Sequence, residues 1–163
     1  MEPPIEDHAH EASLLYIVGR VNHGIRREMR DRLAPWKLSV QQYTTLSVLD
    51  TRPGLSNAQL ARRAMVTPQS MLEILARLEE RGLVVRAVDP SHALILRAQL
   101  TREGRELLAQ AAPEVQAIQD DLLNGVSARD RAVVLRVMSR AMGLLSRHSQ
   151  ASAMHANSAS RGS

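Results

Sequence analysis

A polar cluster in the middle of this 163-residue chain has the side chains needed to hydrogen-bond nucleobases. The outward positions at the start of one short amphipathic segment are Thr67, Gln69, Ser70 and Glu73, with Arg77 following on the same segment. Glutamine can form paired hydrogen bonds to adenine, serine and threonine can reach base edges, and glutamate can accept from cytosine. Arginine suits phosphate oxygens. The cluster therefore predicts contacts with DNA, the alternative being an ordinary solvated helix face.

Two short helices are expected to hold this cluster in place. Thr67 can cap the helix that bears the cluster, and Gly82 suits the left-handed backbone at its end. An earlier helix over residues 56–64, capped by its first residue, contains Arg62 and Arg63 beside the intervening turn. This arrangement is a helix-turn-helix, and the arginine pair is placed for phosphate contacts.

Two extended runs follow the helix-turn-helix. Residues 83–88 and 94–100 are rich in leucine, valine and isoleucine, and a turn-forming segment separates them, which predicts a β-hairpin. A helix-turn-helix followed by a hairpin is a winged helix. The hairpin offers Arg86, His92 and Arg97 as further DNA contacts.

Long amphipathic segments flank the winged helix on both sides. Their apolar residues recur at helical spacing over residues 12–34 and 101–147, and Pro35 ends the first of them. Ser39 is the expected cap of the next helix, with Gln42 in capping-box position. After residue 101, Gly104 is tolerated in the first helical turn, and Pro113 should kink the helix rather than end it. One small domain offers too little surface to bury both, so a homodimer through the terminal helices is expected. The predicted fold is mainly α, a winged helix-turn-helix with long N- and C-terminal helices forming a dimerisation region. The predicted boundaries are a flexible arm over 1–11, a domain over 12–147 with the helix-turn-helix and wing at about 39–100, and a disordered tail over 148–163.

Bulk composition excludes several classes of protein. The chain has no cysteine, so it contains neither a disulfide nor a thiol-based redox sensor. No apolar run approaches the ~18 residues of a membrane span and the N-terminus lacks an apolar signal core, so we expect a cytoplasmic location. Motifs for a nucleophile elbow, a zinc protease or a phosphate loop are missing, so we expect neither enzymatic activity nor a cofactor. The net charge of +4 suits a nucleic-acid partner without being diagnostic.

A second group of side chains could bind a small aromatic acid. Such a ligand needs rings to pack against and a cation to pair with its carboxylate. The first long helix offers both on one face, and the following loop and helix add two further rings. Each ring could instead belong to the core, so the packing interpretation stays open beside the ligand one. The candidates are Tyr16, Arg20, His23, Arg27, Trp36 and Tyr43.

The polar N-terminal segment contains His8, His10 and Glu11, which resemble a fragment of a metal site. No second ligand cluster and no cysteine accompany them. We therefore interpret the segment as a solvated arm and expect no metal.

Four segments together resemble the MarR (multiple-antibiotic-resistance regulator) family of winged-helix regulators. They are the predicted helix-turn-helix over residues 56–71, the helix-to-wing junction LARLEERGLVVR over 75–86, the pair Asp89-Pro90, and the run Leu-Thr-Arg-Glu-Gly over 100–104. The resemblance implies a dimeric DNA-binding transcriptional regulator, in most members a repressor, that binds a palindromic operator. It also implies release from DNA by a small aromatic or phenolic ligand.

The wing departs from the family pattern. Many members have Asp-Arg-Arg where this chain has His92, Ala93 and Leu94, and the family's wing arginine enters the minor groove. We therefore expect the wing either to bind DNA more weakly or to rely on Arg86, Arg97 or His92. The altered wing keeps an alternative open, a winged-helix module that binds another protein, for instance an antirepressor with weak DNA affinity. A regulator that responds to a metal is a third option.

Overall fold

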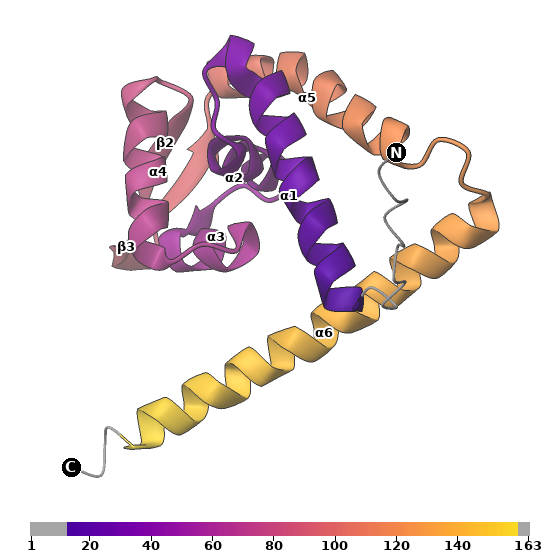
Figure 1. Cartoon of the computed structure of the whole chain (residues 1–163). Coiled ribbons are helices and arrows are strands. Elements are labelled where there is room, and N and C mark those ends of the chain that lie inside the picture. The colour runs from indigo at the N-terminus through magenta and orange to yellow at the C-terminus, as the bar shows by residue number, and fades with distance from the viewer. Residues whose placement is uncertain (1–12, 160–163) are drawn as a thin grey trace, which may run out of the picture. The chain divides into compact units, whose positions relative to one another are not determined.

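The computed structural model describes residues 13–159, and side chains through Leu145 (Figure 1). The chain divides into two compact units, residues 1–119 and 120–163. The expected N-terminal arm over residues 1–11, with its two histidines and Glu11, lies outside the described residues.

The order of elements confirms the predicted mainly helical fold with a winged helix at its centre. A helix-turn-helix is followed by a hairpin, and long helices precede and follow them (Figure 1). The elements are α1 (Leu14–Leu33), the 3-10 turn η1 (Ala34–Trp36), α2 (Val40–Thr51), β1 (Leu55–Ser56), α3 (Asn57–Ala64), α4 (Pro68–Glu80), β2 (Val84–Asp89), β3 (His92–Leu100), α5 (Arg102–Leu122) and α6 (Ala128–Ala159).

Local sequence signals set the helix boundaries as predicted. Pro35 lies in the turn that follows α1, because proline cannot continue the hydrogen-bond ladder of a helix interior. Ser39 caps α2 in a reciprocal box, in which its Oγ accepts from the Gln42 N–H at 3.1 Å and its own N–H donates to Gln42 Oε1 at 2.9 Å. Ser56 and Gln59 form the same box at the start of α3. Each such cap stabilises its helix by about 1 kcal/mol.

The three-stranded antiparallel sheet contains one strand that the sequence pattern does not predict. Its order is β1-β3-β2, and the unpredicted strand β1 pairs Leu55 with Ala98 and Ser56 with Arg97. A two-residue strand has no alternation of its own, and its partner lies far along the chain. This strand ties the start of α3 to the hairpin.

The hairpin is longer, and its turn tighter, than predicted. β2 continues to Asp89 and β3 begins at His92, which leaves Pro90 and Ser91 as the turn. The Asp89 carboxylate accepts a hydrogen bond from the Ser91 N–H at 2.8 Å, a bond that aspartate commonly makes to close a turn. This local bond explains why the strands extend beyond the run of apolar residues.

The hydrophobic core joins the end of α1 to α2, α3 and α4. The chain has no phenylalanine, and leucine fills most of this core. The fully buried members include Leu33, Leu46, Leu60, Leu75 and Leu78. Because α4 turns one apolar face into this core, its opposite face is presented to solvent.

Gly104, in the first turn of α5, is required by packing. A Cβ at this position would lie 2.1 Å from the Leu83 carbonyl oxygen. The sequence predicts only that glycine is tolerated here, whereas the structure leaves no room for a larger residue. Thr101 secures the same junction, since its Oγ1 donates to the Gly82 carbonyl at 2.7 Å and accepts from the Gly104 N–H at 2.9 Å.

Helix α5 follows the predicted pattern, whereas α6 is longer than predicted. α5 continues through Pro113, as the apolar period predicts. α6 runs to Ala159, whereas the composition after residue 147 predicts a disordered tail. The segment over 148–159 contains no proline or glycine and several alanines, so a continuing helix agrees with its propensity. Among the described residues, no helix is both long and apolar enough to cross a membrane.

The described side chains of α6 leave apolar surface exposed. None of them is buried, and the exposed ones include Val133, Val134, Val137, Met138 and Leu145. In the other unit, the first turns of α1 expose a similar set, Leu14, Leu15, Ile17, Val18 and Val21. Contiguous apolar surface of this kind marks a protein–protein interface.

Candidate nucleic-acid interface

The turn between α3 and α4 is short and held by hydrogen bonds. Met65 takes the left-handed conformation (φ 56°) that ends α3. Thr67 then caps α4, because its Oγ1 accepts from the Ser70 N–H at 3.1 Å. The same hydroxyl donates to Ser70 Oγ at 2.9 Å. The two hydroxyls predicted to reach DNA therefore also position each other.

Asn57 braces the two helices of the helix-turn-helix. Its Nδ2 donates to the Pro68 carbonyl at 3.0 Å, which links the first turn of α3 to the first turn of α4. Its Oδ1 is buried and accepts no hydrogen bond from any described residue. The sequence pattern does not single out this residue, because its partner lies 11 positions away.

The face of α4 that is predicted to contact DNA is exposed and lies opposite the face that packs into the core. Gln69, Ser70, Glu73 and Arg77 are exposed, whereas Met71, Leu75 and Leu78 are buried. The predicted DNA-contacting side chains of this helix therefore share one accessible side.

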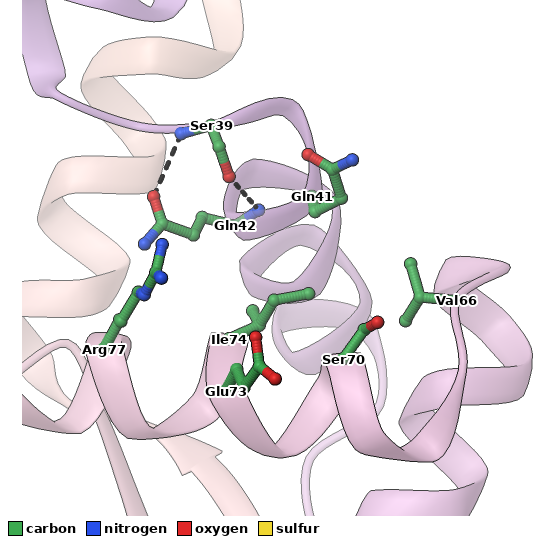
Figure 2. A pocket seen from close by; sticks show the side chains of 8 residues that line it. All are labelled: Ser39, Gln41, Gln42, Val66, Ser70, Glu73, Ile74 and Arg77. Carbon is green, nitrogen blue, oxygen red and sulfur yellow. Dashed lines mark hydrogen bonds between the residues drawn. The ribbon is translucent and has the colours of Figure 1, made fainter.

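A cavity of about 310 Å³ lies between this face of α4 and the first turn of α2. Ser70, Glu73 and Arg77 line it from α4, and Gln41 and Gln42 line it from α2 (Figure 2). Figure 2 shows the Arg77 guanidinium and the Gln42 amide pointing toward one another. The sequence identifies Gln42 only as a helix cap, because adjacency of α2 and α4 depends on tertiary packing.

The arginines at the end of α3 are accessible. Arg62 and Arg63 are both exposed, and Arg63 lines a hollow of about 300 Å³ with Val48, Thr51 and Arg52. Within the described part of the chain, neither arginine side chain makes a hydrogen bond or ion pair, and the same holds for Arg77. All three guanidinium groups are therefore available to phosphates.

The wing arginines are engaged within the domain. Arg86, on β2, forms a paired interaction with Glu79 of α4, in which Nε donates to Glu79 Oε2 at 2.8 Å and Nη2 contacts the same oxygen. The hydrogen bond to Glu79 raises the pKa of Arg86 above its ordinary value, although partial burial opposes the effect. This pair locks the hairpin onto α4.

Arg97, on β3, is held at two points. Its Nε donates to the Asp89 carboxylate, and its Nη1 donates to the Gly54 carbonyl at 2.9 Å. Asp89 is almost fully buried, and the hydrogen bond from the Ser91 N–H, with Arg97 beside it, holds the pKa of its carboxyl below the ordinary range. Arg97 thus connects the hairpin tip to the loop before β1. Its contact with DNA, like that of Arg86, stays a prediction.

The tip of the wing, residues 89–94, contains no lysine or arginine. His92 is exposed, and its Nδ1 contacts the Ser91 carbonyl oxygen. Leu94 is 100% exposed. Its exposure is not predictable from the strand pattern, in which a leucine would ordinarily face the core.

The six candidate ligand residues do not form one site in the structure. On α1, Arg20 Nη1 donates to the Tyr16 hydroxyl at 3.2 Å, and the guanidinium carbon lies 5.9 Å from the Tyr16 ring centre. His23 and Arg27 are exposed further along the same helix. Trp36 is half-buried against the core. The structure therefore brings Tyr16 and Arg20 into contact with each other.

Tyr43 lines a different cavity, of about 430 Å³, between α2 and α5. Leu108 and Ala112 form an apolar wall on α5, while Asp50 and Arg105 supply charged groups. The other five ligand candidates do not line this cavity. Among the described residues, no group of three histidine, cysteine, aspartate or glutamate side chains could hold a metal.

Comparison with known proteins finds transcriptional regulators that are similar to most of the chain. A family model described as the MarR family matches residues 36–93. The chain is 36% identical over 132 residues to the HTH-type transcriptional repressor Rv2887 of Mycobacterium tuberculosis (strain ATCC 25618 / H37Rv), which is 81% of this chain and 95% of that protein.

Solved structures agree with this similarity. The crystal structure of Rv2887 with salicylic acid matches with a TM-score of 0.64 and 36% identity, covering 81% of this chain and 98% of that chain. The transcriptional repressor CouR, bound to a 23-mer DNA duplex, matches with a TM-score of 0.71 and 28% identity, covering 82% of this chain and 94% of that chain.

Proposed function

The chain belongs to the MarR family of transcriptional regulators, and from this premise we propose that it is a homodimeric repressor that binds a palindromic operator. The observation that supports this most directly is the exposed polar face of α4, held by the caps and braces of the helix-turn-helix. Gln69, Ser70 and Glu73 would contact base edges. The available arginines, Arg62 and Arg63 with Arg77, would contact phosphates.

Dimerisation is supported by the apolar surface that α1 and α6 each expose. We assign residues 12–34 and 101–147 to the dimerisation region, and 39–100 to DNA binding. A two-fold dimer would place two α4 helices about 34–36 Å apart, one turn of DNA, which suits a palindrome. Because the target is chromosomal DNA, the repressor would act in the cytoplasm, and a binding role of this kind needs no enzymatic activity.

A small aromatic or phenolic acid is the proposed effector. The Tyr16–Arg20 pair offers a ring and a cation in contact, and the cavity beside Tyr43 offers an apolar wall near Arg105. His23, Arg27 and Trp36 are the remaining proposed contacts. A ligand that prefers the conformer with mis-spaced recognition helices would pull the dimer off DNA by a population shift.

A binding titration with DNA from upstream of the chain's own gene tests the proposal. Labelled duplex and a scrambled duplex are titrated by fluorescence anisotropy at two salt concentrations. We expect tighter binding to the native duplex and weaker binding at higher salt, because phosphate contacts release counterions. Equal affinity for both duplexes would exclude specific operator binding.

The second candidate is a winged-helix module that binds another protein. The engagement of both wing arginines favours it, because the wing then offers little charge to DNA. Size-exclusion chromatography with and without operator DNA separates the two. A dimer that does not co-elute with the duplex would support the protein-binding module.

A further inference from the structure

We propose that Leu94 is the side chain with which the wing contacts DNA, and that this contact is apolar and lies in the minor groove beside the half-site. The inference rests on the proposed function as a DNA-binding repressor. It replaces the expectation that Arg86 or Arg97 substitutes for the cation missing from the wing, whereas contact by His92 stays a prediction.

The two wing arginines act as braces. Arg86 binds Glu79 of α4, and Arg97 binds both Asp89 and the Gly54 carbonyl. Asp89 is almost fully buried, so withdrawal of Arg97 toward a phosphate would leave a buried carboxylate without its cation. Withdrawal of Arg86 would likewise break the ion pair between the hairpin and α4. Neither arginine can reach DNA without loosening the wing.

Leu94 lies on the part of the wing that is next to α3 and α4. It is 100% exposed, two residues beyond the start of β3. A groove of about 430 Å³ connects it with Leu72 of α4 and with Asn57 and Ala58 of α3. Figure 1 shows the free end of the hairpin beside α3 and the first turns of α4. A duplex bound by α4 would therefore meet Leu94 next.

A leucine at this position suits the minor groove. Proteins that bind this groove often place leucine, isoleucine or methionine against or between its bases. Such a contact removes apolar surface from water and releases no counterion, so it should not depend on salt. It should also lack the preference for narrow A·T-rich grooves, which arises from their attraction for cations.

The test uses the full-length protein and a labelled duplex that the wild type selects from a random library. Affinity is measured over a salt series for the wild type, Leu94→Ser, Leu94→Arg and the control Val85→Ser. Val85 is 50% exposed near the other end of the hairpin. Thermal unfolding of each variant verifies that the fold is retained, and Leu94 is exposed enough for substitution to leave it intact.

We expect Leu94→Ser to weaken binding by the dimer about a hundredfold at every salt concentration, because each of the two wings loses about tenfold, the loss for one buried leucine side chain. Leu94→Arg should steepen the dependence of log affinity on log salt by about two for a dimer, one new phosphate contact per wing. Val85→Ser should change neither the affinity nor its dependence on salt. Hydroxyl-radical footprinting, which probes the sugars along the minor groove, should show flanking protection in the wild type and Val85→Ser but not in Leu94→Ser.

An unchanged affinity and footprint for Leu94→Ser would overturn the inference while leaving the proposed function intact. If that variant instead lost only self-association in sedimentation experiments, Leu94 would belong to a protein contact and the inference would be wrong. A wild type that selects no duplex at all would overturn the proposed function, and this inference with it.

Discussion

At the scale of single residues, we propose two kinds of DNA contact in the helix-turn-helix: side chains that distinguish one base from another, and side chains that bind the phosphate backbone. Gln69 is exposed at the start of α4, and Arg62 is exposed at the end of α3 without a partner in the described structure. A glutamine paired to adenine distinguishes one base pair from another, whereas an arginine on a phosphate does not. The two residues therefore form a matched comparison.

Gln69→Ala should reduce discrimination at one base pair of each half-site by about 1–3 kcal/mol. Arg62→Ala should weaken binding to all sequences alike and lower the salt slope by about one per contact. Both effects are measured by anisotropy against duplexes that carry single base-pair substitutions. A uniform loss in Gln69→Ala would show that this residue binds the backbone instead.

The buried carboxylate of Asp89 leads to a prediction of how the stability of the protein depends on pH. Its pKa is held below the ordinary value by the Ser91 N–H and by Arg97, so the charged carboxylate stabilises the folded state. A depressed pKa gives a stabilisation that is present above the unfolded-state pKa, about 3.9, and is lost as the pH falls through the folded-state value.

Asp89→Asn should therefore lower the free energy of unfolding near neutral pH, and the difference from wild type should shrink on acidification through that range. Urea denaturation at a series of pH values measures this, with the exposed Asp50→Asn as the control. A difference between Asp89→Asn and wild type that does not change with pH would contradict the prediction.

At the scale of elements, predictability depended on the distance between the residues that interact. Ser39 and Gln42, three positions apart, predicted the start of α2 correctly. The pairing of β1 with Ala98 and the bond from Arg97 to Gly54 join residues about forty positions apart, and no local pattern reveals them. The candidate site follows the same rule. The exposed face of α4 was predicted correctly from the periodicity of that helix alone. The ion pairs of Arg86 and Arg97 were not predicted, because they depend on tertiary packing.

The junction between the wing and α5 gives an element-scale prediction. Gly104→Ala should destabilise the protein by about 1–3 kcal/mol, because its Cβ would clash with the Leu83 carbonyl. Gly24→Ala is the matched control, since a Cβ there meets nothing within 4 Å in α1. That change should stabilise the protein by about 0.5–1 kcal/mol, the ordinary gain for alanine over glycine in a helix.

Chemical denaturation compares the two glycine variants. Equal effects in the two variants would mean that α5 shifts to accommodate the new methyl group. The decisive result is therefore whether Gly104→Ala has a lower free energy of unfolding than Gly24→Ala, rather than either value alone.

At the scale of the whole molecule, the described side chains of α6 do not form a buried core within this chain. Val133, Val134 and Val137 are all exposed, although they recur at helical spacing. An isolated helix gains little from an apolar stripe that stays in water, since most helical stability in proteins comes from burying such a face. A second copy of the chain is the proposed occupant of this surface.

Val137→Asp should therefore weaken the dimer, because it would place a carboxylate in an apolar interface without a partner. Sedimentation equilibrium over a dilution series should show a shift toward monomer. Operator affinity should fall with it, since a monomer contacts one half-site only. Ser139→Asp, an exposed position two residues along the same helix, supplies the same charge as a control. If Val137→Asp kept the wild-type mass at every dilution while Ser139→Asp did not, the interface would lie on the opposite side of α6.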